Sequence, residues 1–296
     1  MSSAAGGLVI VDKPADWTSH DVVARLRRLA GTRRVGHAGT LDPMATGVLV
    51  VGVGPATKLL HHLVLADKAY TATIRLGQAT DTDDAQGTVT AASGAGAITP
   101  DDVRAAMRPL TGAIEQVPST VSAIKVDGQR AYARARAGET VQLAARPITV
   151  GRFVARDFRR VTDELLDVDV EVECSSGTYV RALARDLGAA LGTGGHLTAL
   201  RRTRVGPFSL DAALTLEELA SSDDPIGLPL PAAIRCAMPV REVSADEARE
   251  LSFGRALEAR GVEGVHGALG PDGTALALLR ESDGAARPLL VFVAAG

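Results

Sequence analysis

A glycine-rich segment, residues 36–47, runs directly into an apolar run, residues 48–53, and this pairing constrains the chain more than any other stretch. Its glycines and Pro43 place the backbone in conformations that regular helices and strands do not adopt. Because Pro43 keeps the preceding residue extended, the carboxylate of Asp42 is mounted on a stiff loop beside a buried strand. Such a mount suits a nucleophile or a general base, although an isolated Leu-Asp-Pro is also an ordinary turn.

The composition is typical of a globular protein with one large and one small domain. The chain has 296 residues, a net charge of −3, 46% hydrophobic and 23% charged residues. Its apolar runs are too short to span a bilayer, and its N-terminus lacks a secretory signal. Cys174 and Cys236 lie far apart, with no second Cys or His at metal-ligand spacing. We expect a cytoplasmic monomer without membrane attachment, disulfide or zinc site.

Positive charge is concentrated in three clusters and comes almost entirely from arginine. Arginine suits bidentate contacts with phosphate and stacking on bases, so basic clusters on an acidic body favour a structured RNA ligand. A codon bias would give the same enrichment, and a solvated surface would show the same charges. The clusters are Arg25, Arg27, Arg28, Arg33 and Arg34; Arg130, Arg134 and Arg136; and Arg201, Arg202 and Arg204.

Residues 70–76 and 166–174 alternate apolar and polar side chains, which predicts two half-buried strands. After the second strand, leucines at four-residue spacing predict a helix that begins near Tyr179. This places Arg181 in the first turn, where a cation faces the positive end of the helix dipole. The position is unfavourable unless Arg181 meets a carboxylate.

Capping signals and turns predict the remaining elements. Thr18 with Asp21, and Thr99 with Pro100 and acidic residues, predict helix starts. We also expect a buried strand at 8–11, a helix at 56–66, a flexible connection at 91–97, a projecting arm at 117–138 and an acidic linker at 221–231. The last stretch predicts a small β-rich domain with a helix at 244–252 and strands at 268–269, 274–279 and 289–293.

Several familiar motifs are excluded. Residues 52–58 lack the Gly-Lys-Ser/Thr ending of a phosphate loop, and no Gly-x-Ser-x-Gly elbow occurs. Residues 81–87 are rich in aspartate, but their glycine is one place late for a calcium loop. Nucleotide hydrolysis, serine hydrolysis and calcium binding at this loop therefore lose support.

The motifs taken together resemble those of the TruB family, the bacterial tRNA pseudouridine-55 synthases. The matching blocks fall in family order between residue 8 and about residue 210. They are Gly36–Gly47, Ala56–Lys58, Asp67–Tyr70, Leu76–Gln78, Thr80–Asp83, Pro118–Ser119, Ser122–Lys125, Arg146–Ile148 and Cys174–Arg181.

The resemblance implies an α+β pseudouridine synthase fold, with a mixed, largely antiparallel central sheet flanked by helices. It implies a catalytic domain at 1–230, with an RNA-binding insertion at about 117–147, and a PUA-like RNA-binding domain at 237–296. It also implies a reaction that needs no cofactor or metal: a uridine in the T arm of tRNA is flipped out and isomerised to pseudouridine at position 55.

The resemblance also implies the site residues. Asp42 is the nucleophile, attacking C1′ or C6, or acting through C2′ elimination. Arg181 is its ionic partner and Tyr70 stacks on the base, although a strand tyrosine is equally often a core residue. Substrate and RNA contacts are implied for His37, which fills the space of the flipped base, and for Lys13, Lys58, Lys125, Arg130, Arg134, Tyr179, Leu200 and Arg202.

Two other functions stay open on the sequence. One is a non-catalytic tRNA-binding protein or RNA folding chaperone, and the other is a related synthase that acts on another RNA. The presence of Asp42, Tyr70 and Arg181 together favours an enzyme, because RNA binding alone does not require them.

Overall fold

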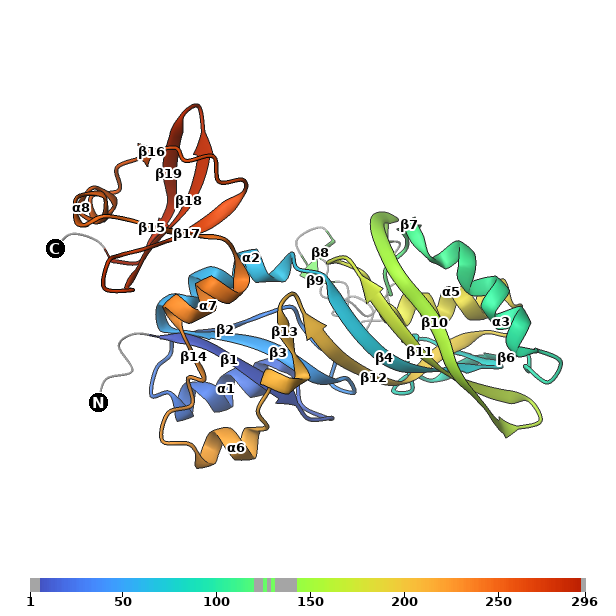
Figure 1. Cartoon of the computed structure of the whole chain (residues 1–296). Coiled ribbons are helices and arrows are strands. Elements are labelled where there is room, and N and C mark those ends of the chain that lie inside the picture. The colour runs from blue at the N-terminus through green and yellow to red at the C-terminus, as the bar shows by residue number, and fades with distance from the viewer. Residues whose placement is uncertain (1–5, 120–124, 127–128, 131–142, 294–296) are drawn as a thin grey trace. The chain divides into compact units, whose positions relative to one another are not determined.

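The computed structural model describes residues 6–119, 125–126, 129–130 and 143–293. These residues form two compact units, each made of separate stretches of the chain (Figure 1). Unit 1 comprises residues 1–42, 48–64 and 206–296, and unit 2 comprises residues 43–47 and 65–205. The mixed α+β class with a large mixed sheet is confirmed.

Unit 2 is built on a sheet in the order β7-β10-β11-β4-β12, in which neighbouring strands are antiparallel. The start of β3 adds a parallel pairing, of residues 46 and 47 with Arg201 and Arg202. The strands are β4 (Lys68–Leu76), β7 (Gly112–Gln116), β10 (Arg146–Thr162), β11 (Leu165–Cys174) and β12 (Gly195–Val205); β3 spans Thr46–Val53, and the short pairs are β5 (Gln78–Thr80) with β6 (Val89–Ala92) and β8 (Lys125–Val126) with β9 (Gln129–Arg130).

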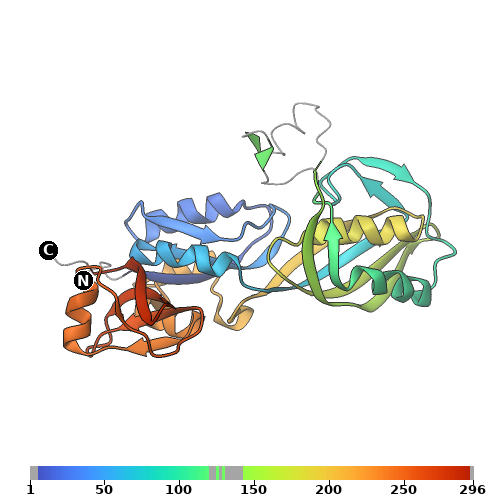
Figure 2. The same ribbon diagram turned by 90° about the horizontal axis from the view of Figure 1, so that it is seen from above.

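The two faces of this sheet differ in chemistry. In β4, Tyr70, Ala72 and Ile74 are buried, while Thr71 and Thr73 point to the other side. Helix α5 (Val180–Ala190) packs on β12 and β4, and α3 (Pro100–Met107), continued by η3 (Arg108–Leu110), packs beside it (Figure 2). The buried face therefore lies under α5, and the polar face lies on the opposite side.

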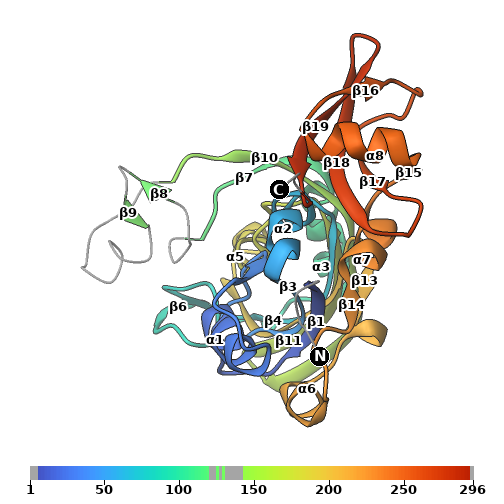
Figure 3. The same cartoon turned by 90° about the vertical axis from the view of Figure 1, so that its left-hand side faces the viewer.

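Unit 1 contains the order β14-β1-β3, with β2 antiparallel to β3. Near the C-terminus it has a sheet in the order β15-β17-β18-β19-β16, and helix α8 packs beside that sheet (Figure 3). Its elements are β1 (Gly7–Lys13), α1 (Ser19–Leu29), β2 (Val35–Ala38), η2 (Gly54–Leu59), α2 (Leu60–Val64), β13 (Phe208–Ser209), η4 (Leu210–Ala212), α6 (Leu216–Ser221), β14 (Leu228–Pro229), α7 (Leu230–Ala237), β15 (Val240–Glu242), α8 (Ala245–Ser252), β16 (Leu257–Glu258), β17 (Val265–Leu269), β18 (Ala275–Ser282) and β19 (Ala285–Val291).

Local sequence signals account for most element starts. Thr18, Thr99 and Ser244 each accept a hydrogen bond from the backbone N–H three residues later. The carboxylate of that later residue accepts one from the backbone N–H of the cap residue, so these helices begin at complete capping boxes. The predicted strands at 70–76 and 166–174 are confirmed.

Other expectations need correction. The helix expected at 56–66 is a 3-10 helix followed by one short α-helix, since Gly54 and Pro55 open it tightly. Residues 91 and 92, expected in a connection, belong to β6. The arm expected at 117–138 lies largely outside the described residues.

Close approach of α5 to β12 depends on Gly188. A Cβ at this position would lie 2.2 Å from the backbone of Gly194 and Gly195. We predict that Gly188→Ala lowers the free energy of unfolding by about 1–3 kcal/mol, because the helix must move off the sheet. Chemical denaturation measures the change. Ala189→Ser, on the exposed side of the same helix, should change stability little; equal losses for both variants would contradict the packing role.

Candidate active site

The three residues predicted to carry the chemistry come from different stretches of the chain. Asp42 belongs to unit 1, whereas Tyr70 and Arg181 belong to unit 2. The structure defines the surroundings of each residue within its own unit. The approach of Asp42 to Arg181 stays a prediction.

Asp42 is half-buried in the loop between β2 and β3. The preceding residue, Leu41, is hydrogen-bonded to Ser19, the first residue of α1. Ser19 is only 1% exposed. The Ser19 hydroxyl accepts a hydrogen bond from the Leu41 N–H (2.9 Å) and donates to the Leu41 carbonyl (3.2 Å). A helix start and Pro43 thus restrain the backbone on both sides of Asp42.

Gly47 ends the loop, at a position where the backbone requires a glycine. Its φ is +99°, which L side chains rarely adopt, and a Cβ there would lie 2.2 Å from the Arg202 carbonyl oxygen. The glycine therefore permits the start of β3 to run directly against β12.

His37 lies on β2 and is half-buried. Its ring packs edge-on against His20 of α1, with 5.7 Å between ring centroids. The structure thus places this predicted RNA-contacting residue beside the Asp42 loop, on the strand that leads into it.

Two predicted RNA-binding lysines bind carbonyl groups inside unit 1. Lys13 is fully buried and its ammonium donates to the carbonyls of Pro14 (2.8 Å) and Trp17 (2.6 Å). The ammonium of Lys58 donates to the Val291 carbonyl (3.0 Å) and lies 5.9 Å from the centroid of the Phe292 ring. Both side chains hold backbone segments of the protein.

Tyr70, Leu200 and Arg202 share the buried face of the unit 2 sheet. Tyr70 pairs with Arg202 on one side and with Val172 on the other, and Leu200 pairs with Ala72. The exposed fractions are 7% for Tyr70, 7% for Leu200 and 1% for Arg202. The register therefore brings three predicted site residues together, with an arginine deep in an apolar surface.

Lys68 is a buried base on the same face that the sequence analysis did not assign. Burial, together with the charge of Arg202, lowers its pKa from 10.5 to about 8. Nearby, burial raises the pKa of the Cys174 thiol from 9.0 to about 11. Buried surroundings of this kind have a low effective dielectric, in which charges interact strongly.

Arg181 occupies the second position of α5 and is 3% exposed. Its guanidinium donates to the Thr82 carbonyl (2.9 Å), and its Nε lies 3.6 Å from a carboxylate oxygen of Asp84. Asp84 is itself 4% exposed and accepts hydrogen bonds from Thr82 Oγ1 (2.6 Å) and from the Gln86 N–H (3.0 Å). A carboxylate therefore offsets the unfavourable position of a cation at a helix start, as the sequence required.

The aspartate-rich loop at 81–87 is thus a support for helix α5. Asp83, with a φ of +60°, is 8% exposed and lies 3.3 Å from Nη1 of Arg185. Burial raises the pKa of Asp83, while Ser119 and Arg185 act in the opposite direction. Sequence reasoning assigned no role to Asp84; the signal was an aspartate cluster that fitted no metal loop.

The remaining predicted residues are Tyr179, Lys125, Arg130 and Arg134. Tyr179 is the residue before α5. Lys125 and Arg130 pair across the two short strands β8 and β9, and Arg134 lies outside the described residues.

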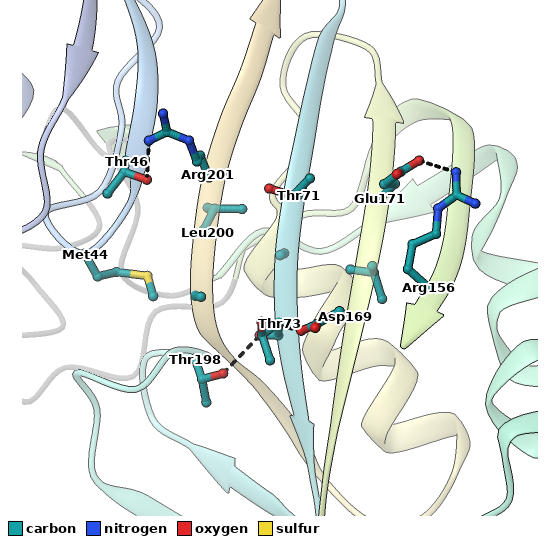
Figure 4. Close-up of a pocket in the computed structure, with 13 residues that line it drawn as sticks. Met44, Thr46, Thr71, Thr73, Arg156, Asp169, Glu171, Thr198, Leu200 and Arg201 are labelled. Atoms are coloured by element: carbon teal, nitrogen blue, oxygen red, sulfur yellow. Dashed lines mark hydrogen bonds and ion pairs between the residues drawn. The ribbon is translucent and has the colours of Figure 1, made fainter. Parts of the chain in front are cut away.

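A pocket of about 530 Å³ is lined by residues of β4, β11 and β12, among them Thr71 and Thr73 of the polar face (Figure 4). Arginine and carboxylate side chains pair across this face, for example Arg156 with Glu171 (2.7 Å). Of the predicted site residues the lining includes Leu200, together with Met44, Thr46, Thr71, Ala72, Thr73, Arg156, Asp169, Val170, Glu171, Thr198, Ala199 and Arg201.

Within the described part of the chain, no group of three or more His, Cys, Asp or Glu side chains is arranged to hold a metal ion. Among the same residues, no helix is long and apolar enough to cross a membrane.

Solved structures share this fold over 98% of the chain. A chain of a Cbf5-Nop10-Gar1 complex is 24% identical and has a TM-score of 0.73. A chain of an H/ACA RNP bound to a substrate RNA containing 2′-deoxyuridine is 22% identical and has a TM-score of 0.71. Each match covers 86% of the chain in the solved structure. At these identities the likeness shows the fold alone.

Family models and curated relatives are more specific. The model of the TruB family pseudouridylate synthase N-terminal domain matches residues 27–180, and two C-terminal models of tRNA pseudouridine synthase B and II match residues 181–224 and 238–293. The chain belongs to the TruB family. Proteins named tRNA pseudouridine synthase B from an Arthrobacter species and from Thermobifida fusca are each 60% identical over 97% of this chain, and 96% and 99% of the relatives are covered.

We predict that Ser19→Ala accelerates hydrogen exchange at the Leu41 amide by about tenfold, because one buried hydrogen bond contributes roughly 1–1.5 kcal/mol. Amide exchange followed by NMR gives the rate. Ser221→Ala removes an exposed serine hydroxyl and should leave Leu41 unchanged. An unaltered Leu41 rate in Ser19→Ala would show that the serine does not restrain the loop.

We predict that one of the four lysines titrates near pH 8 and that this signal disappears in Lys68→Met. NMR titration of the lysine side chains in folded and urea-unfolded protein measures it. Because the folded-state pKa is lowered, Lys68 makes the fold more stable as pH rises from about 8 to about 10.5, while Cys174 acts in the opposite direction from about 9 to about 11. Four ordinary lysine titrations would contradict the burial of this ammonium.

Proposed function

We propose that the chain isomerises uridine to pseudouridine in tRNA and that its target is uridine 55 in the T loop. The observation that carries this proposal is the near full-length similarity, 54–61% identical, to bacterial proteins named tRNA pseudouridine synthase B. Family membership makes the chain an isomerase.

The reaction breaks the N1–C1′ glycosidic bond, turns the uracil and forms a C5–C1′ bond. The proton on C5 is lost and N1 gains one, so the change is an isomerisation without net oxidation. We propose that it requires no metal or organic cofactor and that protein side chains supply the nucleophile and the proton transfers.

Asp42 is the proposed nucleophile, acting at C1′ or C6 or through elimination at C2′. A nucleophilic carboxylate must be ionised, and a cation within about 4–6 Å favours that state in a dry pocket. We assign this role to Arg181. Its burial and its support by Thr82 and Asp84 favour the assignment, because a fixed guanidinium loses little orientational freedom when the substrate arrives.

Tyr70 and Leu200 are the proposed contacts to the flipped uracil, because the strand register places both on the buried face under α5. His37, on the strand that leads into the Asp42 loop, would fill the space that the base leaves. Tyr179 lies two residues before Arg181 and is a further substrate contact.

The proposed RNA contacts divide the basic residues into two groups. Lys125, Arg130 and Arg134 of the insertion at about 117–147 are assigned to phosphates of the T arm. Lys13, Lys58 and Arg202 serve first to hold the protein, since Lys13 and Lys58 donate to internal carbonyls and Arg202 is buried.

We further propose that residues 1–230 act as the catalytic domain and that residues 237–296 form a PUA-like RNA-binding domain. The protein would work as a cytoplasmic monomer. The five-stranded C-terminal sheet is compatible with such an auxiliary domain.

We predict that Asp42→Asn binds tRNA with an affinity within about threefold of wild type and slows conversion by at least about 10³-fold, because the amide cannot act as nucleophile or base. Release of tritium from tRNA transcript carrying [5-³H]uridine measures conversion, and filter binding measures affinity. Asp223→Asn, an exposed carboxylate in the linker, should retain full activity.

A transcript with cytidine at position 55 separates the alternatives. It should bind and give no product. Product from that transcript would move the target to another uridine, and product from another RNA alone would indicate a related synthase. If wild type binds tRNA without converting it, the chain is an RNA-binding protein or chaperone.

A further inference from the structure

The end of β7 and the start of α5 are joined by a buried side-chain amide. The Oε1 of Gln116 accepts a hydrogen bond from the Tyr179 N–H (2.9 Å), and its Nε2 donates to the Tyr179 carbonyl (3.1 Å). Gln116 is 2% exposed. A buried amide needs partners for both its groups, and here one residue supplies them on the main chain.

This contact stands where a helix cap would be. Tyr179 is the N-cap residue of α5, and no side chain caps the helix there, in contrast to the capping boxes of α1, α3 and α8. Gln116 instead fixes the peptide groups on either side of the Tyr179 Cα. Because Arg181 follows two residues later, the orientation of its backbone depends on that peptide.

One helical turn after Arg181, Arg185 contacts Val117, the residue that follows Gln116. Its Nη2 donates to the Val117 carbonyl (2.7 Å), and its Nη1 lies 3.3 Å from Asp83. Residues four apart lie on the same face of a helix, so Arg181 and Arg185 share the face that meets the aspartate-rich loop and the end of β7.

We propose that Gln116 and Arg185 are positioning residues for Arg181, which tie the first turn of α5 to the segment that leads into the RNA-binding insertion. This inference rests on the proposed function. Gln116 is buried and touches no RNA in this role, so its effect falls on turnover. The same contacts connect residues 116 and 117, which precede the proposed RNA-binding insertion, with the helix that carries Arg181.

We predict that Gln116→Met, of similar volume and without hydrogen-bonding groups, lowers kcat by about 10–100-fold, since a small displacement of a catalytic group has effects of this size. The dissociation constant for tRNA should change less than about twofold, because Gln116 does not contact phosphate. Single-turnover conversion and filter binding supply the two numbers. Glu115→Met, exposed on the same strand, is the matched control and should behave as wild type.

Gln116→Glu gives a readout that a purely structural role would not move. The ionised side chain cannot donate to the Tyr179 carbonyl, whereas the protonated acid can both donate and accept. Its activity relative to wild type should therefore recover as pH falls. If Gln116→Met does not fold, Gln116→Glu still tests the proposal. A ratio of variant to wild-type activity that does not change with pH would overturn it.

A double-mutant cycle of Gln116→Met with Arg185→Ala tests whether the two residues act through one element. We expect the double variant to lose less than the product of the single losses. Independent effects, or a loss confined to tRNA affinity, would overturn the proposal. Failure of wild type and Glu115→Met to convert tRNA would instead remove the proposed function itself, so the two failures are distinguishable.

Discussion

The guanidinium of Arg181 is a buried charge at the positive end of a helix, and neighbouring groups of unit 2 stabilise it. A buried cation without partners would cost several kcal/mol, and it would also meet the helix dipole. The Thr82 carbonyl and Asp84 lie where they offset both effects. In the loop at 81–87, Asp83 has a left-handed backbone conformation, and backbone hydrogen bonds join Asp83 and Ala85 to Leu197 of β12.

The sheet of unit 2 separates this chemistry from solvent. Tyr70, Leu200 and Arg202 lie on the face that α5 covers, and burial on that face lowers the pKa of Lys68. The opposite face exposes arginine–carboxylate pairs such as Arg156 with Glu171, which water and salt screen. The Arg181–Asp84 pair lies among buried residues, where the effective dielectric is low and charges interact strongly.

The structure adds internal partners to several basic side chains that the family resemblance implies as RNA contacts. Lys13 and Lys58 bind backbone carbonyls and Arg202 is buried, while their contact with RNA stays a prediction. Long aliphatic stems allow such burial when partners are available. The 17-residue strand β10 and helix α7 were also missed. In β10 the outer residues are exposed on both faces, so no clean alternation appears in its sequence.

Local sequence patterns encode the individual elements and the loop at 36–47. Capping boxes, alternating strands and the residues 36–47 depend on neighbours within a few positions, and the same motifs identify the family. The contact of Asp84 with Arg181 and that of Gln116 with the start of α5 depend on the folded arrangement of the chain. Those contacts join residues 63 to about 97 positions apart in the chain, and they follow from strand register and from the requirement that buried polar groups find partners, which no local pattern encodes.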